Sequence, residues 1–141
     1  MSKNICHMKT SWITLFKKNR FEFGDQHVRQ YVIFECKFLF SIIIFYFEKS
    51  NGSQDRYHTH AFNAISFKLF GEYTEYELLD ENTEAFTIKR RTQIFKYFPR
   101  NSYHKIGNSN GCLTLLLSGP WKKTWKEFKE GVVTKYNWNR K

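Results

Sequence analysis

Residues 52–71 read GSQDRYHTHAFNAISFKLFG and contain two histidines, His58 and His60, separated by one residue. Alternate side chains of a β-strand point to the same face, so a strand here would present both imidazoles side by side. His104 follows the turn-forming residues 99–102 (PRNS) and could bring a third imidazole from a neighbouring strand. Neutral imidazoles bind Fe(II), Ni, Cu and Zn, so the three histidines form a candidate metal site with open coordination positions. The alternative is an ordinary pair of surface histidines on one strand.

The sequence around this segment is typical of an all-β protein. From residue 28 onward, short runs of Val, Ile, Phe, Tyr and Thr are separated by turn-forming sequences such as SNGS at 50–53 and GNSNG at 107–111. Strands are expected at 28–35, 38–47, 56–60, 64–70, 72–79, 84–91, 93–98 and 112–118. No helical pattern separates these runs, which favours an antiparallel sandwich or barrel over a parallel α/β sheet.

The chain of 141 residues is expected to form a single domain, because 41% hydrophobic and 19% aromatic residues can bury one large core. This composition excludes wholesale disorder. Near the N-terminus, the spacing of Trp12, Leu15 and Phe16 is compatible with a short amphipathic helix. The segment that starts at Trp121 is compatible with either a helix or a closing strand.

The formal net charge of +10 is unevenly distributed along the chain. Residues 1–20 hold five basic and no acidic residues, and residues 121–141 hold seven basic and two acidic residues. The positive charge therefore belongs to two basic extensions, and the body between them is neutral. No zinc-finger spacing, recognition-helix pattern or RNP-like motif accompanies it, so nucleic-acid binding is disfavoured.

The three cysteines, Cys6, Cys36 and Cys112, form no C-x-x-C pair, and no signal-peptide pattern begins the chain. Both observations predict a reducing, cytoplasmic setting. The longest apolar run, residues 38–47, is shorter than the roughly 18 residues of a membrane helix and is interpreted as a buried strand. Membrane association is not expected.

The histidines and their neighbours resemble the two motifs of the cupin superfamily. The first motif, G-x5-H-x-H-x3-4-E-x6-G, is matched at both glycines and both histidines by Gly52, His58, His60 and Gly71. Ala64 stands at the position of the glutamate. The second motif, G-x5-P-x-G-x2-H-x3-N, aligns with Gln93, Pro99, Asn101, His104 and Asn108. Asn replaces the turn glycine, a mild change because Asn tolerates a left-handed backbone.

This resemblance implies a single-domain jelly-roll β-barrel with metal ligands His58, His60 and His104. It implies a divalent metal, Fe(II) first with Zn, Ni or Mn as alternatives, or no metal at all, because Ala64 removes the carboxylate ligand. A site of three histidines is similar to that of thiol dioxygenase-type cupins. Three neutral ligands leave the charge of the ion uncompensated, so an anionic substrate is expected.

Four further residues are expected to contact the ligand: Arg56, Ala64, Lys68 and Tyr103. Arg56 shares strand parity with the two histidines of the first motif and could clamp a carboxylate or phosphate; a position on the rim, in solvent, is the alternative. Ala64 and Lys68 share one face of their strand and would point inward unless a bulge reverses the strand.

Two main functions follow from these observations. The first is a metalloenzyme, a dioxygenase or hydrolase, whose metal activates water or dioxygen on a small bound anion. The alternative is a non-catalytic pocket that sequesters an anion such as a nucleotide signal. The bias toward Lys, Asn, Ile, Phe and Tyr resembles that of bacteriophage proteins, so a phage-type anti-defence role belongs to this alternative. A third interpretation is a homodimer that pairs through its sheet faces.

Overall fold

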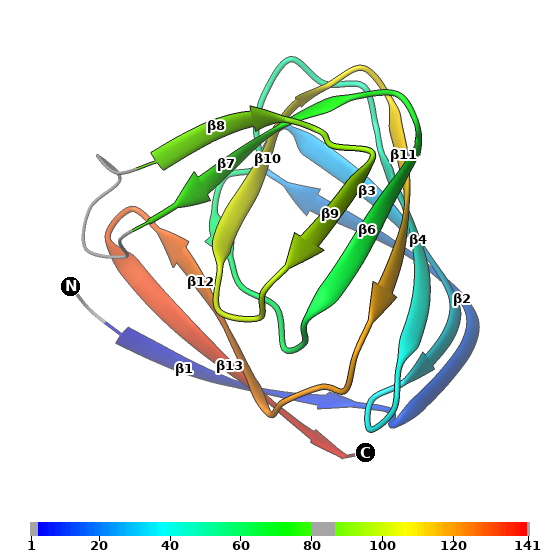
Figure 1. The fold of residues 1–141 in the computed structure, drawn as a ribbon. Coiled ribbons are helices and arrows are strands. Elements are labelled where there is room, and N and C mark those ends of the chain that lie inside the picture. The colour runs from blue at the N-terminus through cyan, green and yellow to red at the C-terminus, as the bar shows by residue number, and fades with distance from the viewer. Residues whose placement is uncertain (1–2, 80–86, 141) are drawn as a thin grey trace.

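The computed structural model, which describes residues 3–79 and 87–140, is all-β (Figure 1). In the chain order of these residues, the strands are β1 (Lys3–Thr10), β2 (Ile13–Phe23), β3 (Gln26–Cys36), β4 (Ser41–Phe47), β5 (Tyr57–His58), β6 (Ala64–Phe70), β7 (Tyr73–Leu78), β8 (Thr87–Arg91), β9 (Phe95–Phe98), β10 (Tyr103–Ser109), β11 (Cys112–Ser118), β12 (Thr124–Lys129) and β13 (Val132–Arg140). Within the described part of the chain, no helix is long and apolar enough to cross a membrane.

The strands form two sheets that enclose a cavity. Sheet A has the order β1-β13-β12-β5-β10-β7-β8, and sheet B has the order β2-β3-β4-β11-β6-β9. Neighbouring strands are antiparallel except β1 and β13, which pair in parallel. The predicted all-β, largely antiparallel architecture is confirmed.

Side chains alternate between the inside and the outside of the two-sheet structure. In β4, Ser41, Ile43 and Phe47 are buried, whereas Ile42 and Ile44 are only partly buried. In β11, alternate side chains from Cys112 to Ser118 are likewise buried. This period of two explains why runs rich in β-branched and aromatic residues form strands with one face in the core.

The two ends of the chain are strands, so the expectation of a terminal helix is wrong. Residues 8–18 contribute to β1 and β2, and β2 pairs with β3 along its length after a turn at Gly24. This hairpin pairing overrides the local helical spacing. At the other end, the closing-strand alternative holds. Glu130 and Gly131 both have positive φ, as a type I′ turn requires, and join β12 to β13.

Several expected boundaries also differ. The run 38–47 becomes a strand only from Ser41, and Phe38, Leu39 and Phe40 are about half exposed in a turn. The strand expected at 56–60 is reduced to Tyr57 and His58. Strand β10, which carries His104, was expected without bounds, and its residues 107–109 were interpreted as part of a turn. A bulge between Ile106 and Ser109 accommodates the glycine and asparagine there. The turn expected at 80–82 and the start of the strand expected at 84–91 lie outside the described residues.

Replacing Gly71 by alanine is expected to destabilise the fold by about 2–3 kcal/mol. Gly71 connects β6 to β7 at φ 77°, and a Cβ there would lie 1.9 Å from the carbonyl oxygen of Gly111. Gly131→Ala is the matched control, because its φ is similar but nothing lies within 4 Å of the added Cβ. The Gly131→Ala variant should lose only about 1 kcal/mol of the free energy of unfolding, as measured by urea denaturation. Equal losses in the two variants would contradict the steric argument.

Candidate metal centre

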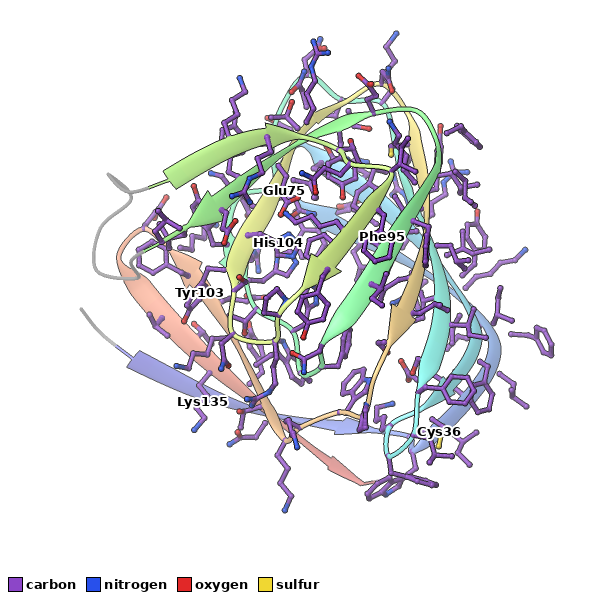
Figure 2. The ribbon with its side chains drawn as sticks, viewed as in Figure 1. Cys36, Glu75, Phe95, Tyr103, His104 and Lys135 are labelled. Carbon is purple, nitrogen blue, oxygen red and sulfur yellow. The ribbon has the colours of Figure 1, made fainter. Side chains whose placement is uncertain are left out.

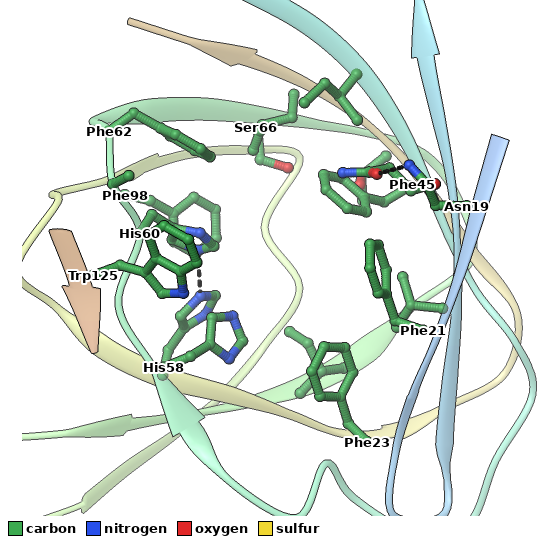
Figure 3. Close-up of a pocket in the computed structure, with 18 of the residues that line it drawn as sticks. Asn19, Phe21, Phe23, Phe45, His58, His60, Phe62, Ser66, Phe98 and Trp125 are labelled. Atoms are coloured by element: carbon green, nitrogen blue, oxygen red, sulfur yellow. Dashed lines mark hydrogen bonds between the residues drawn. The ribbon is translucent and has the colours of Figure 1, made fainter. Parts of the chain in front are cut away.

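Three histidines, two from paired strands of sheet A and one from the segment that follows β5, converge on the cavity (Figure 3). His58 ends β5, His60 follows two residues later, and His104 lies on β10 directly opposite His58. Their candidate ligand nitrogens all lie within 4.8 Å of one another. The Nε2 atoms of His60 and His104 are 2.8 Å apart. The predicted convergence of the three histidines is confirmed.

The cluster fits a divalent metal ion. Two imidazole nitrogens bound to one metal at about 2.05 Å and at right angles lie about 2.9 Å apart, close to the separation of the His60 and His104 nitrogens. The Nδ1 atom of His58 is buried and has no hydrogen-bond partner. Within the described residues, the group contains histidines and no carboxylate, and Ala64 occupies the position of the glutamate in the first motif. The donors are therefore three imidazoles.

The environment keeps two of these imidazoles neutral. Burial lowers the pKa of His58 well below its usual value, and the nearby rings of His104 and His60 lower it further. Burial, followed by the proximity of His104, lowers the pKa of His60 to about 3. Neutral imidazoles retain the lone pair that a metal needs.

The metal-free protein is expected to lose stability as the pH falls from 7 to 5.5. Because the pKa values of His58 and His60 are lowered by folding, the unfolded chain binds more protons below the usual histidine value of 6.5. The free energy of unfolding should fall by about 1 kcal/mol per histidine between pH 6.5 and 5.5. Urea denaturation of the wild type and of a His58→Gln, His60→Gln variant measures this loss. The variant should show a flatter profile, and an identical profile would contradict the assignment.

A buried carboxylate lies behind one of the ligands. Glu75 on β7 is 3% exposed, and its Oε1 atom lies 3.4 Å from Nδ1 of His104 and 2.5 Å from Nζ of Lys96 (Figure 2). Burial raises the pKa of Glu75, but its contacts with His104 and Lys96 outweigh burial and lower the net pKa. An ionised carboxylate thus faces the nitrogen of His104 opposite the one that approaches His60.

The cavity beside the histidines has a volume of about 380 Å³. Its walls come from both sheets and are largely aromatic; the aromatic rings are those of Phe21, Phe23, Phe45, Phe47, Phe62, Phe98, Tyr73, Trp121 and Trp125. Phe23 stacks at 6.1 Å from His58, and Phe62 at 5.2 Å from His60. A polar pair, Asn19 and Gln30, lies among the other lining residues and is joined by a 2.7 Å hydrogen bond (Figure 3).

The two basic residues expected at the ligand do not line this cavity. Arg56 donates hydrogen bonds to Asp55 at 2.8 and 3.0 Å and to Glu127 at 3.3 Å, so its guanidinium is already occupied by carboxylates. Lys68 is on the same face of β6 as the cavity residue Ser66, but it lies farther along the strand. Its Nζ atom is 3.8 Å from Oε1 of Glu72. Among the described lining residues, Lys17 on β2 supplies the positive charge.

The other two residues that were expected to contact the ligand, Ala64 and Tyr103, are buried in hydrophobic clusters. Ala64 is 2% exposed and packs with Phe62 and Phe98 at the start of β6. Tyr103 lies on the face of β10 opposite His104 and packs with Tyr57 and other residues outside the cavity. The structure thus brings together the three histidines and does not bring Arg56, Ala64, Lys68 or Tyr103 to the cavity lining.

Glu75 was missed by sequence reasoning. The sequence did show that Glu75 lies two residues from Tyr73, so that both side chains point to the same face of β7. The pairing of β7 with β10 was not predicted, so the approach of Glu75 to His104 could not be inferred.

No family model matches the sequence, and no curated protein matches it. Among solved structures, oxalate decarboxylase from Bacillus subtilis at pH 4.6 matches with a TM-score of 0.52 and 15% identity over 79% of this chain. A deletion mutant of the same enzyme matches with a TM-score of 0.55 and 13% identity over 86% of this chain. The fold is a cupin-type jelly roll.

This chain spans about 30% of the length of those decarboxylase chains. The DMSP lyase DddQ from Ruegeria pomeroyi also matches, with a TM-score of 0.49 and 16% identity over 64% of this chain and 45% of its own. On this cupin-type fold, the three-histidine group is a candidate metal site.

Proposed function

We propose that this protein is a metalloenzyme that holds a divalent ion at His58, His60 and His104 and acts on a small anionic molecule. The observation that supports it is the convergence of three imidazoles on one wall of a cavity. A divalent ion held there would supply Lewis acidity and open coordination positions for an anion and for water or dioxygen. Fe(II) is the favoured metal, because imidazole ligands suit it. Mn(II) is an alternative, because the structurally similar oxalate decarboxylase has Mn(II) centres.

Charge supports an anionic ligand. Three neutral imidazoles cancel none of the charge of a divalent ion, and a buried charge without a counter-ion is costly. Arg56 and Lys68 are engaged by Asp55 and Glu72, so anion recognition in this proposal rests on the metal and not on a basic clamp. A carboxylate, thiolate or phosphate would complete the site.

The cavity walls support a ligand with a planar apolar body. A volume of about 380 Å³ lies within the usual range for small-molecule sites. Rings such as Phe21, Phe23 and Phe45 exclude water and can stack on a planar group. An aromatic carboxylate therefore suits this cavity better than oxalate, the substrate in the name of the structural neighbour.

One observation favours the sequestering alternative. The described carboxylates at or behind the cavity are all paired: Glu35 with Lys37, Glu75 with Lys96, and Glu127 with Arg56. A general base should be within reach of the reacting group and available to accept a proton. Binding of an anion without turnover, such as capture of a nucleotide signal, needs no such base.

The decisive experiment begins with elemental analysis of protein purified without added metal. About one Fe or Mn per chain is expected, and a His27→Ala variant, altered at a surface histidine, should retain it. Absence of divalent metal, even after incubation with excess Mn(II) at pH 7.5, would contradict the proposal.

Ligand class is then tested by thermal shift of the metal-loaded protein with benzoate, oxalate, cyclic AMP and benzyl alcohol. Benzoate is expected to give the largest stabilisation, and an equal shift with neutral benzyl alcohol would contradict the charge argument. Mass spectrometry of the stabilising compound after incubation in air separates the two functions. New products support the enzyme, and complete recovery of the compound supports the binder.

A further inference from the structure

The outer face of sheet B, the face turned away from the cavity, is apolar across the sheet. The strand registers align its side chains in two ladders that run across the strands. The first ladder is Leu15, Phe34, Ile42, Leu117, Ile65 and Tyr97. The second ladder is Tyr31, Ile44, Leu115, Phe67 and Phe95, with Lys18 at its β2 end.

These side chains face solvent. Leu15 is 57% exposed, Phe95 55% and Tyr97 52%. Residues of the opposite parity on the same strands, such as Ile43 and Leu116, are buried against the cavity. The pattern therefore leaves a continuous apolar sheet face without a cover from the described chain.

Charged residues beside this face are paired with one another. The next ladder along the strands carries Arg20 and Arg29, and both contact Glu48 at 3.3 Å. Arg20 also contacts Glu22 at 2.8 Å. This group of two basic and two acidic residues has no excess positive charge that could attract an anionic lipid surface. The same mixture is compatible with a second copy of the chain.

The area of the face is sufficient for a dimer. Six strands at about 4.8 Å spacing and three ladders at about 6.8 Å spacing cover roughly 600 Å², when the ladder that begins with Arg20 and Arg29 is counted with the two apolar ones. Two such faces would bury about 1,200 Å² in total, the lower limit for a stable specific interface. The two apolar ladders alone cover roughly 400 Å², as much as the largest exposed apolar patch of a typical monomer.

We propose that two copies of this chain pair through the outer faces of their sheets B in an isologous, two-fold dimer. The proposal is independent of the metal centre, because the face and the cavity lie on opposite sides of sheet B. The contact is apolar, so it should persist at high salt.

Light scattering coupled to gel filtration of the full chain at 10–200 µM tests the proposal. The expected mass is twice the 17.1 kDa of one chain, both in 0.15 M and in 1 M NaCl. A Leu117→Lys, Phe95→Lys variant should elute as a monomer with an unchanged circular dichroism spectrum. Tyr97→Lys alone provides a milder substitution should the double variant fail to fold. Leu79→Lys, at a residue that is 59% exposed at the end of β7 in sheet A, is the matched control and should remain dimeric.

A wild-type monomer throughout the concentration range would overturn the proposal. A dimer that survives folded Leu117→Lys, Phe95→Lys or Tyr97→Lys variants, or one that dissociates in 1 M NaCl, would also overturn it. So would a monomer that sediments with phosphatidylcholine and phosphatidylglycerol vesicles, because the apolar face would then belong to a lipid surface.

Discussion

Replacement of His104 by alanine is expected to lower the affinity for Mn(II) or Fe(II) by more than about 100-fold at pH 7.5. Its Nε2 atom lies 2.8 Å from Nε2 of His60, and its Nδ1 atom faces Glu75. The substitution therefore removes one of the three donors and separates the other two from the buried carboxylate. Isothermal titration of the metal-free protein measures the change in affinity.

His27→Ala is the control for this prediction, because His27 contacts Arg20 on the surface and is not part of the three-histidine group. The control should bind metal as the wild type does. A folded His104→Ala variant with wild-type affinity and stoichiometry would show that metal binds elsewhere.

Replacement of Glu75 by alanine is expected to destabilise the fold by about 3–5 kcal/mol, because Lys96 would lose its acidic partner inside the protein. The Lys96 side chain is only 15% exposed and that of Glu75 4%. Glu77→Ala is the matched control on the same strand. Its partner Arg90 is 36% exposed, so the loss there should stay below about 1 kcal/mol. Urea denaturation of both variants measures the two losses.

A second readout separates a positioning role of Glu75 from a purely structural one. Glu75→Gln should lower metal affinity by about 10–100-fold, because a neutral amide orients His104 less strongly. In a Glu75→Met, Lys96→Met variant, removal of both charges should restore much of the stability, whereas metal affinity should stay low. Recovery of affinity together with stability would leave Glu75 with a structural role only.

Local sequence patterns predicted much of the fold. Alternating runs such as 64–70 and 112–118 became strands with the expected bounds, because their side chains decide which face is buried. The two ends were less predictable. The spacing of Trp12, Leu15 and Phe16 is compatible with a helix, and hairpin pairing of β2 with β3, which this spacing does not reveal, selects a strand.

Some residues of the candidate site could likewise be predicted from local sequence, and others could not. His58 and His60 are placed by strand alternation, and His104 by motif spacing, so short stretches of sequence were enough to find them. Glu75 approaches His104 only because β7 and β10 pair in a particular register. The partners of Arg56 include Glu127, 71 positions away along the chain. Contacts of this kind depend on register and side-chain direction, which a single sequence does not specify.

The parallel pairing of β1 with β13 bears on the order in which the chain folds. The first and last strands lie side by side in Figure 1, with Lys3 opposite Val133 and Thr10 opposite Arg140. The residues of β2 to β12 separate the two paired strands along the chain, so β1 has no partner until β13 is in place. Pairing of strands so distant in sequence is slow because a long loop must close. Addition of β1 to the edge of sheet A is therefore expected to be a late step of folding.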